Sequence, residues 1–164
     1  MLLLSLMRKR VFVALFLILV SSSCSSPCHQ WKFAAIKADC PSATYVKVYL
    51  PECNAFNGLE AELVCNNCDM QFYLNAKTLL LPCSCNDQNH TELKIVVCEN
   101  EYKFMAERLL GGQRLLLPED ARQLIICSLL EGNDVEVTVG RYQAMLISEG
   151  FAKTYDQLIT EAFP

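Results

Sequence analysis

The stretch LKIVVCENEYKFMA, residues 93–106, determines the fold class expected for this chain. Apolar side chains alternate along residues 93–97 and again along residues 102–106, with Glu99-Asn100 between the two runs. Alternation with a period of two indicates a strand with one buried face, and two such strands joined by a short turn form a β-hairpin. Antiparallel pairing between neighbouring strands is therefore expected.

Strand patterns continue on both sides of this hairpin. In residues 59–65 the alternation directs Cys65 toward the core and leaves Glu60 and Glu62 on the exposed face. Further strands are predicted at residues 31–36, 44–50, 70–81 (one or two strands), 113–117, 134–139 and 142–148. These patterns amount to about seven or eight strands, joined mostly by hairpin-length connections.

Two helices are predicted in the C-terminal half of the chain. The first begins at Pro118, a residue suited to the first helical position, and ends at Gly132, with Cys127 opposite its apolar stripe. The second covers residues 151–162, where apolar side chains recur at helical spacing. The fold class predicted is α+β: a mostly antiparallel sheet or small sandwich, stapled by disulfides, with the helices against one face or end.

The beginning of the chain has the pattern of an export signal. Arg8, Lys9 and Arg10 precede an unbroken apolar run at residues 11–20, and three serines and Cys24 follow. The charges hold the start of the chain on the cytoplasmic side, and the run is about half the length that a spanning helix needs. We therefore expect a signal peptide at residues 1–23, a tether at residues 24–30 and one globular domain at residues 31–164.

The segment LVSSSC, residues 19–24, resembles the lipobox of bacterial lipoproteins, although the position three before the cysteine is Ser21 rather than leucine. The resemblance covers only the leader. It implies that the Cys24 thiol receives a diacylglyceryl group and that Cys24 becomes the new amino terminus, in a bacterial cell envelope. Two alternatives remain open from the residues: a soluble secreted protein with Cys24 in a disulfide, and a retained signal anchor.

The composition of residues 24–164 limits the classes of partner that the protein is expected to bind. Because the leader contains three basic and no acidic residues, the remaining chain has 11 Lys and Arg against 18 Asp and Glu, a net charge of −7. It also has no basic cluster, so an affinity for nucleic acid is not expected. The apolar content is 52% of the whole chain, which is enough for a core and argues against disorder.

All ten cysteines lie at or after Cys24. In an exported chain this number indicates a disulfide framework. If Cys24 is acylated, nine candidates remain and at least one of them cannot pair within the chain. The candidates are Cys28, Cys40, Cys53, Cys65, Cys68, Cys83, Cys85, Cys98 and Cys127.

Few residues suggest catalysis or a cofactor. The pairs Cys65-Cys68 and Cys83-Cys85 could hold a metal or act as a redox centre, but the second pair has one intervening residue where zinc sites usually have two or more. Serine hydrolase and phosphate-loop motifs are absent from the sequence. We predict no enzyme activity, no cofactor and no metal.

The function predicted from the sequence is that of an exported, lipid-anchored, cysteine-rich envelope protein with a structural or protein-binding role. Its contacts would be the membrane, through Cys24, and another envelope protein, met by strand edges or by the polar loop 83–90. Two alternatives are a soluble secreted disulfide-rich ligand or effector, and a metal-binding or thiol-redox protein that uses the two cysteine pairs.

Overall fold

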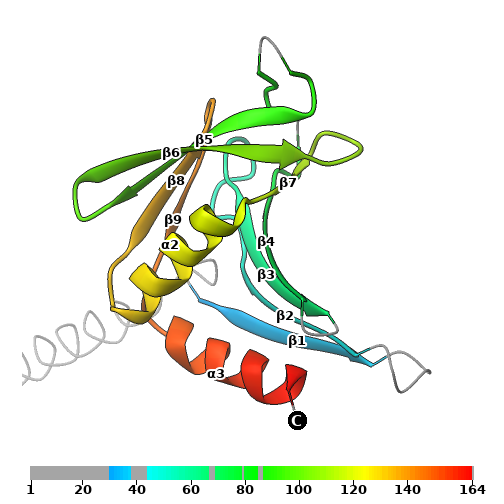
Figure 1. The fold of residues 1–164 in the computed structure, drawn as a ribbon, viewed down its shortest axis with the longest axis vertical. Helices are drawn as coiled ribbons and strands as arrows, with labels where there is room; N and C mark the ends of the chain where they lie inside the picture. Colours follow the sequence, from blue (N-terminus) through cyan, green and yellow to red (C-terminus); the bar gives the residue numbers. More distant parts are fainter. Residues whose placement is uncertain (1–29, 38–43, 67–68, 79, 85–86, 164) are drawn as a thin grey trace, which may run out of the picture.

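A computed structural model describes residues 30–37, 44–66, 69–78, 80–84 and 87–163 (Figure 1). The predicted signal peptide, Cys24 and nearly all of the tether lie outside the described residues. So do Cys28, Cys40, Cys68 and Cys85.

The described residues form a single sheet of nine strands. The strands are β1 Lys32–Lys37, β2 Thr44–Leu50, β3 Glu60–Asn66, β4 Asp69–Asn75, β5 His90–Val97, β6 Asn100–Arg108, β7 Arg114–Leu116, β8 Val135–Val139 and β9 Tyr142–Leu146. Their order in space is β1-β2-β3-β4-β7-β6-β5-β8-β9, and every neighbouring pair is antiparallel. The mostly antiparallel sheet is thus confirmed, with more strands than the sequence predicted.

The central hairpin forms with its turn one residue earlier than predicted. Val97 pairs with Asn100, so Cys98 and Glu99 are the two turn residues. Both have positive φ values, 47° and 68°, as a two-residue hairpin turn with the twist of the flanking strands requires. Glycine or asparagine would signal such a turn more clearly, and this explains why the sequence placed it imperfectly.

Strand β7 joins the two halves of the sheet. It pairs with β4 on one side and with β6 on the other, so β4 and β5, which are consecutive in sequence, do not pair. After Asn75 the described residues contain no second strand before His90. Instead, the amides of Ala76 and Leu81 donate to the carbonyls of Gln113 and Gly112, both at 2.8 Å.

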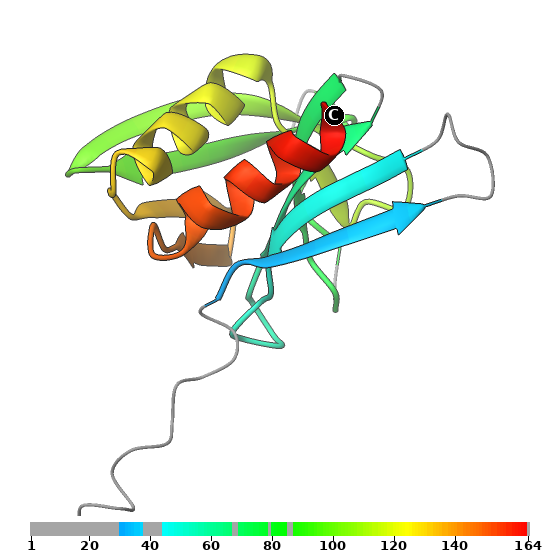
Figure 2. The ribbon, with the colours of Figure 1, turned by 90° about the horizontal axis from the view of Figure 1, so that it is seen from below.

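Both helices lie late in the chain, as predicted: α2 Glu119–Leu130 and α3 Phe151–Ala162. Pro118 occupies the N-cap of α2 rather than its first turn. Cys127 is exposed, as its place opposite the apolar stripe predicted, whereas Leu130, expected to widen that stripe, is 44% exposed. Figures 1 and 2 show α3 running alongside β1 and β2 on the face of the sheet that carries the core.

The start of β1 and the end of β9 meet, although they lie at opposite ends of the strand order. Trp31 is 7% exposed, its indole N–H donates to the Ile147 carbonyl at 2.6 Å, and its ring lies 4.9 Å from the ring of Phe151. Phe151 begins α3. The contacts of Trp31 therefore join three segments: the residues before β1, the end of β9 and the start of α3. Neither α2 nor α3 is long and apolar enough to cross a bilayer, and the described residues contain no other helix.

Candidate functional site

The most organised polar cluster of the described residues surrounds Glu62 on β3. Ala61 and Leu63 point into the core, so Glu62 lies on the opposite, outer face of the sheet. The sequence predicted an exposed carboxylate there, but Glu62 is only 4% exposed. The prediction was wrong because side chains from the adjacent strands β2 and β4, and from β7 one strand further away, cover it.

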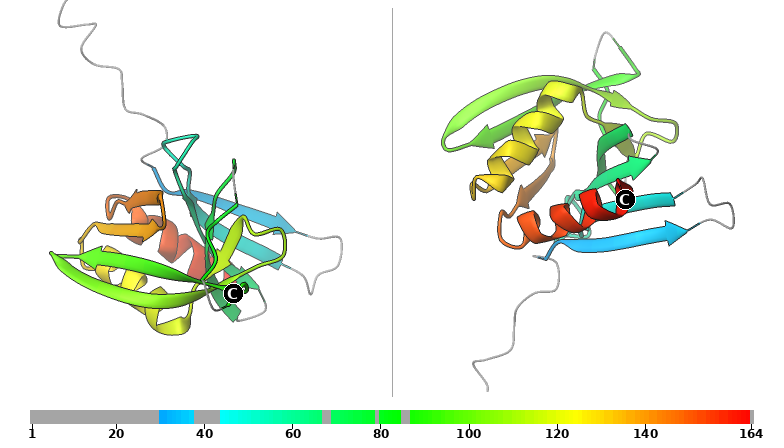
Figure 3. Two further views of the ribbon diagram at one scale, coloured as in Figure 1. Left: turned by 90° about the horizontal axis from the view of Figure 1, so that it is seen from above. Right: turned by 60° about the horizontal axis from the view of Figure 1, so that its bottom comes forward.

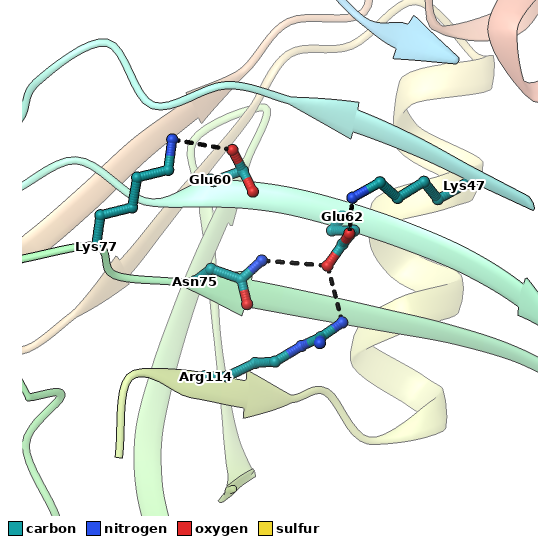
Figure 4. Close-up of polar contacts among 6 residues, drawn as sticks. All are labelled: Lys47, Glu60, Glu62, Asn75, Lys77 and Arg114. Atoms are coloured by element: carbon teal, nitrogen blue, oxygen red, sulfur yellow. Dashed lines mark hydrogen bonds and ion pairs between the residues drawn. The ribbon is translucent and has the colours of Figure 1, made fainter. Parts of the chain in front are cut away.

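Three donors from three strands converge on this carboxylate (Figure 4). The Lys47 ammonium on β2 lies 2.5 Å from Oε1, and the Arg114 guanidinium on β7 lies 2.8 Å from Oε2. The side-chain amide of Asn75 on β4 donates to Oε2 at 3.3 Å. A buried carboxylate needs such partners because an uncompensated charge would lose its hydration with no replacement.

Aromatic rings surround this cluster on the same face. The Arg114 guanidinium stacks over the ring of Tyr73, 3.7 Å from its centroid, and the Lys47 ammonium lies 5.1 Å from the centroid of Tyr49. The Tyr73 hydroxyl donates to Gln71. Half-buried aromatic and basic side chains thus occupy adjacent strands here; we call this surface the outer-face site and define it by Tyr45, Lys47, Tyr49, Tyr73 and Arg114.

The surroundings of Lys47 and Tyr73 shift the pKa values of both side chains. Burial lowers the pKa of Lys47, but the hydrogen bond to Glu62 and the charge of that carboxylate outweigh it and raise the pKa above the ordinary 10.5. Burial also raises the pKa of Tyr73 above the ordinary 10.0, against the opposing effect of the Arg114 cation. Lys47, Arg114 and Glu62 therefore fix one another, and Tyr73 stays neutral.

A second ion-pair group adjoins the outer-face site. The Lys77 ammonium lies 3.2 Å from Glu60, which is two residues before Glu62 on β3 (Figure 4). It also lies 3.6 Å from Glu52. Lys77 is half-exposed, so water screens these pairs more than those of Glu62. Chemically, the face offers fixed hydrogen-bond donors and aromatic surface, which are properties of a recognition surface.

The described cysteines differ in their burial: Cys65 is buried, whereas Cys53, Cys83, Cys98 and Cys127 are exposed. Cys65 is 1% exposed and faces the core, as predicted. It pairs with Met70, near the start of β4. Cys83 follows the other end of β4 and is exposed. Among the described residues no group of histidine, cysteine or acidic side chains could hold a metal ion, and Cys83, Cys98 and Cys127 form no disulfide with another described cysteine.

The polar loop 83–90, the other predicted contact region, is held locally where it is described. Asp87 accepts from the Asn89 amide at 2.8 Å and lies 2.6 Å from the His90 ring, and both contacts lower the pKa of Asp87. The Arg108 amide donates to the Asn89 carbonyl at 2.6 Å. Leu80 and Leu110, on either side of a shallow pocket of about 340 Å³, are strongly exposed.

Sequence reasoning did not find the outer-face site, because its members come from three strands that are far apart along the chain. One signal was present. Val64 breaks the alternation on β3, and an apolar side chain there indicates that the outer face is covered at this point. Val64 is in fact 4% exposed. The partners of Glu62 still depend on the insertion of β7 beside β4, which the sequence does not indicate.

Comparison with known proteins gives no relative: no family model, no curated protein and no solved structure matches the chain. Function has to be inferred from the chain itself.

Proposed function

We propose that this chain is an exported, lipid-anchored domain of a bacterial cell envelope that binds another envelope protein through the outer-face site. The observation that carries the proposal is the order of charge, apolar run, serines and cysteine that ends at Cys24. Acylation of Cys24 would supply several acyl chains at one terminus, which suffices for stable attachment where a single chain is marginal.

The buried position of Trp31 supports a short tether. Trp31 is the first core residue of the domain, and six residues separate it from Cys24. A chain of that length reaches at most about 25 Å. The domain would therefore stay close to the bilayer, where it meets other envelope proteins at a high effective concentration.

The composition of the outer-face site supports protein binding. Tyrosine and arginine are the residues that most often carry binding energy at protein interfaces, and rigid aromatic anchors lose little entropy on binding. Here Arg114 is held by Glu62 and by the ring of Tyr73. The face is thus preorganised, and both helices lie on the other side of the sheet from it, as Figure 3 illustrates.

Oxidised cysteines are part of the proposal. Cys83, Cys98 and Cys127 are exposed on three separate elements, and besides the acylated Cys24 four further cysteines lie outside the described residues. Export to an oxidising compartment favours bridges between these two sets. Disulfides in a small envelope domain add stability by restricting the unfolded chain.

The anchor and the bridges can be tested together by intact mass. Native protein purified from the envelope is weighed with and without reduction, beside a Cys24→Ser variant as the matched control. We expect cleavage before Cys24, the added mass of the acyl groups, and about 2 Da more for each bridge reduced. Unacylated protein in the medium would instead support the secreted alternative, and bound zinc would support the metal-binding one.

The binding face is tested by cross-linking in the cell. A photoreactive amino acid at Tyr45, at the rim of the outer-face site, should give a discrete adduct with one protein. The same label at Gln123, exposed on α2, serves as the control. The adduct should weaken when Arg114→Ala is added. Equal labelling from both positions would refute the assignment of the outer-face site.

A further inference from the structure

The loop between β2 and β3, residues 51–59, lies beside the point where the chain enters the domain. In the β1–β2 register Lys32 pairs with Tyr49, so Trp31 lies next to Leu50, where the loop begins. Figures 2 and 3 show the start of β1 and this loop on the same side of the molecule. Any membrane anchor a few residues before Trp31 would hold this side toward the bilayer.

Phe56 at the tip of the loop is 81% exposed. A single exposed apolar side chain needs no explanation by itself, but the surroundings of Phe56 differ from those of the rest of the surface. Residues 53–59, CNAFNGL, carry no charged side chain in a chain that is otherwise acidic. The flanking carboxylates Glu52 and Glu60 share Lys77 as their ion-pair partner, so the net charge of −1 lies at the base of the loop and not at its tip.

The loop presents Phe56 in a fixed position. The Asn54 side chain accepts from the Phe56 amide at 2.9 Å, and the Asn54 carbonyl accepts from the Gly58 amide at 2.8 Å. The Asn57 carbonyl accepts from Gln143 on β9 at 3.0 Å. These bonds satisfy backbone groups at the tip internally, and this lowers the cost of moving the tip out of water.

We propose that Phe56 and its loop are a second membrane contact, inserting into the interfacial region of the bilayer to which the chain is anchored. The inference rests on the proposed acylation of Cys24. An aromatic side chain on an internally bonded loop tip without charged side chains suits the boundary between headgroups and acyl chains. Contact at two points fixes the tilt of the domain, which an acylated tether alone leaves free.

The test is tryptophan fluorescence on vesicles. Full-length acylated protein carrying Phe56→Trp is reconstituted into phosphatidylcholine vesicles, with and without brominated acyl chains, which quench tryptophan on contact. Native Trp31 is buried and present in every sample, so its signal is subtracted using the wild-type protein. We expect the emission of the added tryptophan to shift to the blue and to fall in brominated vesicles.

The matched control is Leu110→Trp. Leu110 is fully exposed at the turn between β6 and β7, away from the start of β1 in Figures 1 and 2. The tryptophan at this position should keep its emission in both kinds of vesicle. Vesicle-bound protein with an unquenched tryptophan at position 56, or quenching at position 110 instead, overturns the membrane contact and leaves the anchor intact. Protein that carries no acyl groups and stays off the vesicles overturns both proposals.

Discussion

At the scale of single residues, the cluster around Glu62 decides how the outer face behaves. A carboxylate placed between two cations is stabilised by them only while all three keep their charges, and the loss of one leaves the others poorly solvated. The Lys47 and Arg114 side chains are 25% and 38% exposed, so water can compensate part of that loss.

Glu62→Gln should therefore lower the free energy of unfolding by about 1–3 kcal/mol, less than for a fully buried pair. The amide keeps the size of the side chain and removes only its charge. Glu92→Gln is the control, because Glu92 is 62% exposed and lies 3.5 Å from an equally exposed Lys103. The Glu92→Gln substitution should lower the free energy of unfolding by less than about 0.5 kcal/mol, measured by urea denaturation. Equal effects of the two substitutions would contradict the buried network.

The raised pKa of Lys47 predicts a loss of stability at alkaline pH. A group whose pKa is higher in the folded state contributes stability that is complete below its unfolded value, here 10.5, and disappears as the pH rises through the folded value. Tyr73 also has a raised pKa and changes stability in the same direction. The comparison of Lys47 with Lys47→Met is therefore made in a Tyr73→Phe background, from neutral pH to above 10.5.

In that comparison, the free energy of unfolding lost through Lys47→Met should be constant below pH 10.5 and should shrink above it. The physical reason is that deprotonated lysine no longer pairs with Glu62. A difference that is the same at every pH would show that Lys47 contributes through its aliphatic stem alone.

At the scale of elements, the loop between β2 and β3 depends on one glycine. A Cβ atom at Gly58 would lie 2.3 Å from the Asn54 carbonyl oxygen, which is backbone and cannot move aside. The loop would have to open, with loss of the bonds from Gly58 to Asn54 and from Gln143 to Asn57. The edge strand β9 would then lose its contact with this loop.

We expect Gly58→Ala to cost more than about 2 kcal/mol of unfolding free energy, measured by chemical denaturation. Gly111→Ala is the control. Gly111 has a φ of 89° and open space around its Cβ position, so alanine there meets only the backbone strain of about 1 kcal/mol. Similar costs at the two positions would mean that the loop adapts to the added methyl group.

The elements themselves were largely predictable from local patterns. Residues 44–50 form β2 as predicted, and both helices and both C-terminal hairpins lie within a few residues of their predicted positions. A strand or helix that buries one face has apolar residues at every second position or at helical spacing. These patterns lie within a short segment of sequence and can be recognised there. Of the one or two strands predicted within residues 70–81 a single one forms, β4, and the chain leaves the sheet after Asn75.

At the scale of the whole molecule, the sequence did not predict which strands pair with one another. The pairing of β4 with β7 and of β5 with β8 joins segments far apart along the chain, and no local pattern specifies such partners. The outer-face site depends on that topology, since Arg114 reaches Glu62 only because β7 lies beside β4. The site could therefore not be predicted from local patterns, whereas the residues that predict an export signal before Cys24 are contiguous in the sequence.

The helix α3 connects the two ends of the sheet. It follows β9 at one end of the strand order and packs against β1, β2 and β3 at the other end. Leu158, on this helix, is fully buried, and Phe151 at its start contacts Trp31. If α3 closes the fold in this way, unfolding of the two ends of the sheet should be coupled.

Leu158→Ala should lower the free energy of unfolding by about 2–4 kcal/mol through lost burial and the cavity left behind. Leu130→Ala, at a leucine that is 44% exposed on α2, should cost less than about 1 kcal/mol. Trp31 is the only tryptophan, so its fluorescence reports the contact between α3 and β1, while circular dichroism reports the whole sheet. Because α3 joins the two ends, both signals should change at the same urea concentration in Leu158→Ala. A Trp31 transition at lower urea than the circular dichroism transition would show that α3 is merely appended to an independently stable sheet.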